Sequence, residues 1–216
     1  SSFYLKPSNY VNKLPTSSLK RSIDDFKLDA LSYDSEAERL PGALPPVNFF
    51  DPFRLSRGRS FEQVKKYREA ELKHGRLAML AVLGFLIQEI FHPLFGGDIQ
   101  PPAIYHFQQV GERFPNFWVL IMFAIGLVEA KTIYRGWETY DKTRERPDGV
   151  AMLKDDYIPG DLGFDPLNMM PTSEREFEIR RTKELQNGRL AMLAISGIIA
   201  QELVDGKGVF QHLGWQ

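Results

Sequence analysis

The feature that most constrains the fold of this 216-residue chain is an internal repeat. Residues 71–89, ELKHGRLAMLAVLGFLIQE, align without a gap to residues 184–202, ELQNGRLAMLAISGIIAQE, and 12 of the 19 positions are identical. Phe-Asp-Pro precedes each copy, at residues 50–52 and 164–166. Such self-similarity indicates one structural unit used twice. We therefore expect two like helices related by a pseudo-two-fold axis, with an unrelated segment between them.

Three apolar runs, residues 77–91, 117–130 and 190–204, indicate that the helices cross a membrane. Each run is shorter than the roughly 18 residues that define a spanning segment. The helical pattern continues upstream of the first and third, however, which lengthens those helices to about 45 Å. We predict an all-α membrane protein with three transmembrane helices near 61–91, 115–137 and 173–204. They form one domain, 49–216, after an extended arm, 1–48, and residues 93–115 and 146–171 are expected to be loops.

The distribution of charge supports a membrane orientation. Lys and Arg cluster before the first run and between the second and third, whereas residues 92–112 contain neither. By the positive-inside rule, the N-terminus and the second connection share one side. The net charge of −1 gives no reason to expect nucleic acid, and the lack of cysteine excludes thiolate metal sites and a cysteine nucleophile. The first methionine is Met79, which we interpret as a processed N-terminus.

Each copy of the repeat carries one Glu and one Arg that cannot easily pair with each other. Glu71 and Arg76 are five residues apart, as are Glu184 and Arg189, so they point about 140° apart on one helix. An unpaired charge beside an apolar run is costly. We predict reciprocal pairs, Glu71 with Arg189 and Glu184 with Arg76, between two crossed helices. Small residues, including Gly75, Gly84, Gly188 and Gly197, are expected to allow close approach.

The same segments present single Lewis bases that do not converge on one metal cage. His74 offers a ring nitrogen, and Asn187 an amide oxygen at the matching position; Gln88 and Gln201 offer amide oxygens farther along. A bare zinc or calcium ion needs several converging ligands. Each base here can instead supply one axial ligand to the magnesium of a separate flat, hydrophobic macrocycle.

The two segments beginning Glu-Leu-Lys-His-Gly-Arg and Glu-Leu-Gln-Asn-Gly-Arg, with both Phe-Asp-Pro turns, resemble the paired signatures of the light-harvesting chlorophyll-binding superfamily. Within it, the chain is most similar to the fucoxanthin/peridinin chlorophyll a/c-binding antenna proteins of red-lineage algae. The resemblance implies that chlorophyll magnesium is bound by Glu71, His74, Glu184, Asn187 and Gln201. It also implies that Arg76 and Arg189 lock the ion pairs.

Two further candidate ligands, Glu129 and Gln88, have weaker support. Glu129 matches a ligand position on the middle helix, but the usual arginine three residues later is replaced by Thr132. Lys131 or Arg135 is a candidate to supply the missing positive charge beside Glu129. Gln88 rests on the internal symmetry alone.

The resemblance implies a light-harvesting antenna subunit that passes excitation to a photosystem and is not an enzyme. The expected cofactors are chlorophyll a, chlorophyll c, carotenoids of the fucoxanthin, peridinin or diadinoxanthin type, and bound lipid. The expected partners are a photosystem core, with photosystem I favoured over photosystem II, neighbouring antenna subunits and thylakoid lipids. The expected location is the plastid thylakoid membrane, with several passes and a stromal N-terminus.

Two alternatives remain open. An enzyme is disfavoured because the chain lacks a Ser-His-Asp order, a phosphate-binding loop, a dinucleotide glycine motif and HExxH. A photoprotective member of the same superfamily, which dissipates excitation, would share every ligand. Acid sensing by such a protein would require carboxylates on the side opposite the basic loops, where the candidates are Asp98, Glu112 and Asp205.

Overall fold

The computed structural model describes residues 40–45, 48–91, 97–138 and 151–214. The long helices are α2 (Phe61–Ile90), α4 (Pro115–Gly136) and α5 (Glu174–Asp205), and the short ones are η2 (Ala103–Tyr105), α3 (His106–Arg113) and α6 (Val209–His212). The long helices begin and end within one residue of the expected ranges, and the all-α fold class is confirmed. Most of the expected arm lies outside the described residues. The chain divides into two units, Ser1–Val64 and Lys65–Gln216, and all but the first turn of α2 belongs to the second.

The two repeat helices start and stop at recognisable signals. Ser60 and Gln63 form a capping box at the start of α2, in which each side chain accepts a hydrogen bond from the other residue's backbone N–H. Helix α5 begins after Ser173 and has two glutamates in its first turn, where negative charge suits the helix dipole. It ends at Gly206, whose φ of 64° is the left-handed conformation that favours glycine at this position.

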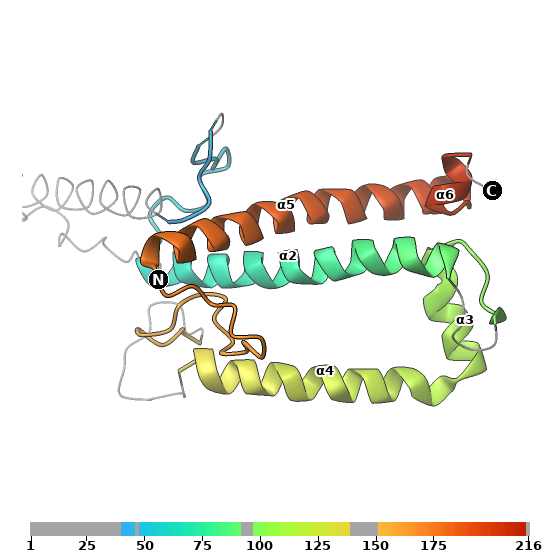
Figure 1. Ribbon diagram of the computed structural model, residues 1–216, viewed down its shortest axis with the longest axis horizontal. Coiled ribbons are helices and arrows are strands. Elements are labelled where there is room, and N and C mark those ends of the chain that lie inside the picture. The colour runs from blue at the N-terminus through green and yellow to red at the C-terminus, as the bar shows by residue number, and fades with distance from the viewer. Residues whose placement is uncertain (1–39, 46–47, 92–96, 139–150, 215–216) are drawn as a thin grey trace, which may run out of the picture. The chain divides into compact units, whose positions relative to one another are not determined.

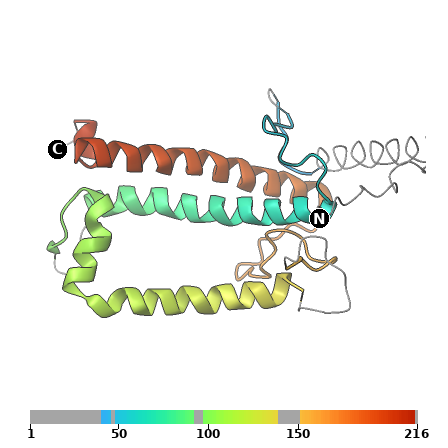
Figure 2. The same cartoon turned by 180° about the vertical axis from the view of Figure 1, so that it is seen from behind.

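The contact between α2 and α5 is closest at a pair of glycines. A Cβ atom on Gly75 would lie 2.9 Å from the Cα of Gly188, and the reverse distance is the same. Leu72 and Leu185 are buried one turn before these glycines. Figures 1 and 2 show that the two helices lie side by side and run in the same direction. Equivalent points of the repeat therefore meet at one crossing, as the pseudo-two-fold relation requires.

Gly84 and Gly197 do not contribute to this close approach. A Cβ on either would have no atom of the described residues within 4 Å. The expectation that they bring the helices together is therefore wrong. They lie nine residues beyond the two glycines of the crossing.

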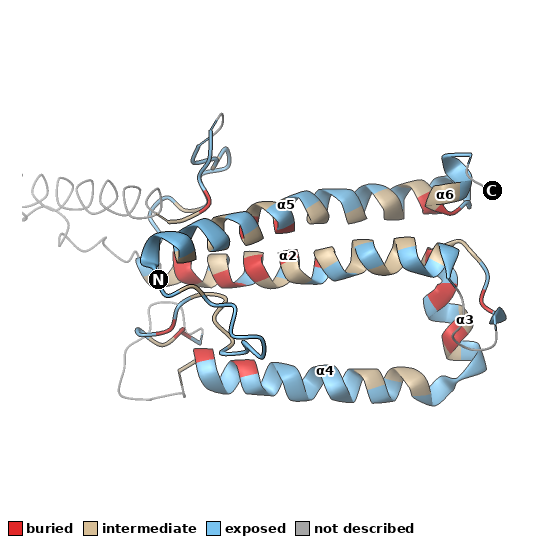
Figure 3. Ribbon diagram, viewed as in Figure 1, coloured by how far each residue is buried: buried red, intermediate tan, exposed pale blue. Residues whose placement is uncertain are grey.

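Helix α4 runs opposite to α2 and α5 and is joined to α2 through the region of α3 (Figure 1). Among the described residues, it is the one helix whose length and apolarity alone meet the usual test for a membrane span, and only 6% of its apolar window is buried. Figure 3 shows that most of its surface is exposed. Extensive apolar exposure of this kind indicates a surface that contacts lipid or bound apolar molecules rather than water.

The segment 93–115 is not simply the loop that the glycines and prolines suggested. Within its described part, η2 and α3 occupy residues 103–113, with His106 and Val110 buried. Trp118 stacks on Phe107 with ring centroids 4.3 Å apart and donates its indole N–H to the Phe107 carbonyl. The sequence analysis missed α6 as well. Helices α3 and α6, of 8 and 4 residues, are too short for a periodic apolar signal.

The glycine contact predicts a position-dependent response to alanine. Gly188→Ala places a methyl group against the Gly75 backbone, so we expect the free energy of unfolding to fall by about 1–3 kcal/mol, as overpacking does elsewhere. Gly197→Ala has open space and is the matched control. It should be neutral or stabilising by up to about 1 kcal/mol, because alanine favours helix more than glycine does. Thermal unfolding followed by circular dichroism measures both, and equal effects would contradict the assigned crossing point.

Candidate functional site

The site is organised around two ion pairs that cross between α2 and α5. Arg76 Nε donates to Glu184 Oε1 at 2.6 Å, and Arg189 Nε donates to Glu71 Oε1 at 2.7 Å. The four side chains are between 28% and 39% exposed. Both reciprocal pairs expected from the five-residue spacing are thus present. In each, the arginine holds one carboxylate oxygen and leaves the second for another contact.

The surroundings of the two glutamates differ. Arg68 Nη1 lies 3.3 Å from Glu71 Oε2, so Glu71 has a second cation nearby. The equivalent arginine in the other copy, Arg181, donates instead to the carbonyl of Pro159. Glu184 Oε2 accepts no hydrogen bond from the described residues. Arg181 still interacts electrostatically with Glu184, but it forms no ion-pair contact with it. The symmetric repeat therefore contains one carboxylate in contact with two arginines and one in contact with a single arginine.

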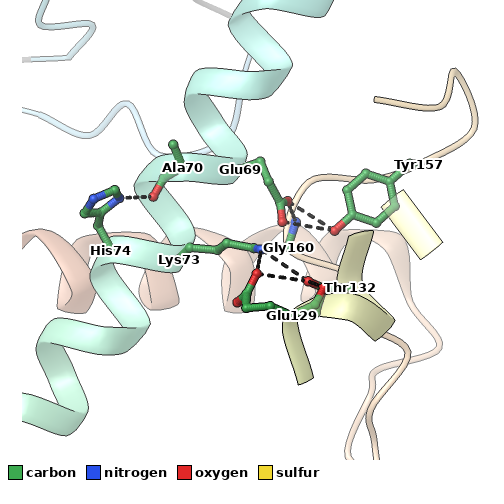
Figure 4. Close-up of polar contacts among 8 residues, drawn as sticks. All are labelled: Glu69, Ala70, Lys73, His74, Glu129, Thr132, Tyr157 and Gly160. Carbon is green, nitrogen blue, oxygen red and sulfur yellow. Dashed lines mark hydrogen bonds and ion pairs between the residues drawn. The ribbon is translucent and has the colours of Figure 1, made fainter. Parts of the chain in front are cut away.

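His74 and Asn187 occupy matching, exposed positions one turn after these glutamates. The His74 Nδ1 atom lies 2.7 Å from the carbonyl oxygen of Ala70 (Figure 4). A carbonyl only accepts hydrogen bonds, so Nδ1 carries the proton and Nε2 keeps a lone pair. Fixing one ring nitrogen in this way is what orients a histidine that binds metal through the other.

The two glutamines at the far end of the repeat are not equivalent. Gln201 donates its amide NH₂ group to the carbonyl of Lys207 at 3.0 Å, which directs Oε1 away from that contact. Gln88 Oε1 lies 3.3 Å from the Nδ1 atom of His106. His106 is buried on α3 beside Gln88. The geometry favours Gln201 over Gln88 as a ligand, and both assignments stay predictions.

Glu129 on α4 obtains its cation from another helix. Lys73 Nζ lies 2.7 Å from Glu129 Oε2, and Thr132 Oγ1 lies 3.2 Å from the same oxygen (Figure 4). The sequence analysis offered Lys131 or Arg135 as the compensating residue. Arg135 instead pairs with Asp161 at 3.2 Å, so that suggestion is wrong for Arg135.

The segment after residue 150 is anchored to α2 by a buried carboxylate. Glu69 is only 3% exposed, and it accepts hydrogen bonds from the Gly160 N–H at 2.6 Å and from the Tyr157 hydroxyl at 3.2 Å. Burial, reinforced by Glu69, raises the pKa of Tyr157 to about 12, so its hydroxyl stays a donor at neutral pH. The Tyr157 ring also packs on Gly136, where a Cβ would lie 2.9 Å from it.

A cavity of about 650 Å³ opens beside this anchor. Its lining includes Arg76 and Glu184 from one ion pair, Phe177 from α5, and Phe164 and Asp165 from the second Phe-Asp-Pro turn. The ion pair, the turn and an aromatic side chain thus border one space that is open to a large, partly apolar molecule.

The two Phe-Asp-Pro turns have the same internal geometry. Asp51 accepts hydrogen bonds from the backbone N–H groups of Leu55 and Ser56, both at 2.8 Å, and Asp165 accepts those of Met169 and Met170 at 2.9 and 2.8 Å. The Ser56 hydroxyl also donates to Asp51 and, with these N–H groups, lowers the pKa of Asp51 below its usual value. Both oxygens of each carboxylate are used within the turn, so turn capping accounts for these aspartates.

Two further carboxylates lie at the opposite end of the crossed helices. Glu89 and Glu202 end the two copies of the repeat, 113 residues apart. Glu202 is fully buried, its Oε2 accepts the Ile104 N–H at 2.8 Å, and Glu89 is its neighbour. Glu89 accepts the N–H groups of Val209 at 2.8 Å and Phe210 at 3.0 Å. The sequence analysis missed this pair, although conservation of the glutamate between the two copies was a signal for it.

The donor set fits magnesium macrocycles bound one at a time. The described residues contain no group of three or more His, Cys, Asp or Glu side chains able to hold a bare metal ion. The candidate ligands are instead separate side chains on helix surfaces. His74 is exposed and Glu184 is half-buried, and both lie beside apolar helix surface. Each can bind one axial position of a large apolar ring.

Comparisons with known proteins agree with this chemistry. Residues 36–203 match the family model described as chlorophyll A-B binding protein. Light-harvesting complex stress-related protein 1 of Chlamydomonas reinhardtii is 47% identical over 191 residues, which cover 86% of this chain and 71% of that protein. Stress-related protein 3.2 of the same alga is 46% identical, covering 82% and 67%. A fucoxanthin-chlorophyll a-c binding protein of Isochrysis galbana is 43% identical, covering 80% of each chain.

The unequal surroundings of the ion pairs predict an order of damage. Arg76→Leu leaves Glu184 without its hydrogen-bond donor, whereas Arg189→Leu leaves Glu71 close to Arg68. A half-buried carboxylate that loses its hydrogen-bond donor costs up to about 1–3 kcal/mol, so Arg76→Leu should lower the melting temperature most. Arg189→Leu should follow. His74→Leu carries no ion pair and should do least, removing mainly one bound macrocycle.

Melting temperature and bound pigment per chain, measured on the three reconstituted variants, give the order directly. If Arg76→Leu and Arg189→Leu retained their ligands as stably as His74→Leu, the pairing argument would be wrong.

Proposed function

This chain belongs to the chlorophyll a-b binding protein family, and on that premise we propose that it is a photoprotective subunit that dissipates excess excitation when its surroundings become acidic. The family makes it a chloroplast chlorophyll-binding protein and not an enzyme. Bound chlorophyll supplies the light absorption and the excited state. The protein's own contribution is to hold the pigments and to change their arrangement in response to a signal.

The observation that carries this proposal is the carboxylate pair Glu89 and Glu202. Each holds the start of a short helix: Glu202 accepts an N–H at the start of η2, and Glu89 accepts two at the start of α6. Hydrogen bonds to an ionised carboxylate are roughly twice as strong as those to a neutral group. Adding protons to this pair therefore weakens its hold on both short helices and changes the charge between α2 and α5.

Two other carboxylates at this end are already paired. Asp205 lies 2.7 Å from His212, and Asp98 forms an ion pair with Arg113. His106 on α3 adjoins Gln88. If the N-terminus is stromal, as the basic residues indicate, this end of the protein faces the lumen, which acidifies in strong light.

The names of the relatives give a second line of support. Two of them are described as stress-related light-harvesting complex proteins. Disposal of excess excitation is the response to light stress that a chlorophyll-binding protein can perform by itself. The sequence predicts light harvesting as the main function and dissipation as the alternative, and these relatives support the alternative better.

Light harvesting alone is the second candidate function. It is favoured by the similarity to a fucoxanthin-chlorophyll a-c binding protein. That relative is the basis on which chlorophyll c and fucoxanthin stay among the proposed cofactors. The photosystem partner, with photosystem I favoured, and the ligand roles of Glu71, His74, Glu184, Asn187, Gln201, Glu129 and Gln88 are likewise proposals.

Fluorescence lifetime against pH separates the two functions. The reconstituted protein should show a shorter chlorophyll lifetime at pH 5 than at pH 7.5. Glutamine resembles a protonated carboxyl group, so Glu89→Gln/Glu202→Gln should shorten the lifetime at both pH values and lose most of the pH dependence.

Glu112→Gln, an exposed carboxylate on α3, is the matched control and should respond like the unmodified protein. His212→Gln tests the contribution of the His212–Asp205 contact. A lifetime that is long and independent of pH in the unmodified protein would leave light harvesting as the function. A full response in the double variant would exclude the carboxylate pair as the sensor.

A further inference from the structure

We propose that Lys73 of α2 is a positioning residue that replaces the missing arginine of α4 as the counter-charge of Glu129, so that the two helices together build one magnesium-ligand site. This inference rests on the binding of chlorophyll by the chain. It does not depend on whether the bound pigments harvest light or dissipate it.

The contacts divide the Glu129 carboxylate into a closed and an open oxygen. Lys73 Nζ lies 2.7 Å from Oε2 and 3.3 Å from Thr132 Oγ1, and the Thr132 hydroxyl lies 3.2 Å from the same Oε2. Oε1 accepts no hydrogen bond from the described residues. One oxygen is therefore neutralised and held in place while the other keeps its lone pairs.

Exposure supports the same division. Thr132 is buried, whereas the side chain of Glu129 is 48% exposed and that of Lys73 is 29% exposed. About half of the Glu129 side chain is thus uncovered, on a helix whose apolar surface is almost wholly exposed. A carboxylate on such a surface is costly without a cation, and Lys73 is the cation in contact with it.

The sequence repeat is broken at the position where the middle helix docks. Lys73 corresponds to Gln186 in the second copy, although the residues on both sides of the signature are largely identical. In Figures 1 and 2, α4 lies beside α2 and not beside α5. The lysine thus occurs only in the copy that has a glutamate of α4 to neutralise.

Lys73 and His74 serve different faces of α2. Adjacent residues of a helix point about 100° apart, so two neighbouring side chains cannot serve the same site. Figure 4 shows Lys73 directed toward Glu129 and His74 directed away from it. One turn of α2 therefore contributes a proposed ligand on one face and a counter-charge for a second ligand on another.

The test compares variants that keep the charge of Lys73, that remove it, or that remove the Glu129 carboxylate which it neutralises. Lys73→Met should lose the same single chlorophyll as Glu129→Gln, identified by the same missing band in the absorption difference spectrum. Lys73→Arg keeps the charge and should retain that chlorophyll. Gln186→Met, at the matching position of α5, is the control and should keep the full pigment set.

The double variant Lys73→Met/Glu129→Gln tests whether the lysine acts through the glutamate. It should lose no more pigment than Glu129→Gln alone. It should also melt at a higher temperature than Lys73→Met, because no unpaired carboxylate remains. This comparison still decides the question if Lys73→Met fails to assemble.

Three results would overturn the proposal. The first is a full pigment set in Lys73→Met. The second is the loss, in Lys73→Met and in the double variant, of several chlorophylls that Glu129→Gln retains. The third is failure of both Lys73→Met and the double variant to assemble, which would make Lys73 a general packing residue. A failure of the dissipation proposal would appear in the lifetimes of the unmodified protein and would not alter these pigment counts.

Discussion

The reciprocal ion pairs between α2 and α5 are the interaction on which the rest of the structure depends. A long helix with a glutamate and an arginine five residues apart cannot neutralise itself. Crossing two copies at Gly75 and Gly188 brings each glutamate to the other helix's arginine. The charges that would otherwise keep these helices out of a membrane thereby hold them together. Arg76 also leaves one oxygen of Glu184 open, so a structural contact prepares a proposed ligand.

The same arrangement recurs with variations that distinguish otherwise similar sites. Glu184 has an open oxygen, Glu71 has a second arginine nearby, and Glu129 is neutralised by a lysine from another helix. At the opposite end, Glu89 and Glu202 bind backbone N–H groups of short helices instead of cations. Glu89 and Glu202 also neighbour each other, and this is the pair on which we propose that protons act.

Much of this could be predicted from the sequence because the information was local or repeated. Helix lengths followed from periodicity, and the cross-pairs followed from the spacing of Glu71 and Arg76. The Lys73–Glu129 contact could not be predicted, because the residues are 56 positions apart and nothing in the repeat says which helix α4 packs against. The short helices α3 and α6 lacked a periodic signal. Glu89 and Glu202 lie inside the repeat, but candidate acid sensors were sought in the loops and tail beyond it.

A double-mutant cycle on Arg76 and Glu184 tests the central claim most directly. The unfolding free energies of the unmodified protein, Arg76→Leu, Glu184→Leu and the double variant isolate the coupling between the two side chains. We predict a coupling of about 1–3 kcal/mol, with the double variant more stable than Arg76→Leu because no unpaired carboxylate remains. Additive effects, with coupling below about 0.5 kcal/mol, would show that the crossed helices do not depend on the pair and would contradict the account.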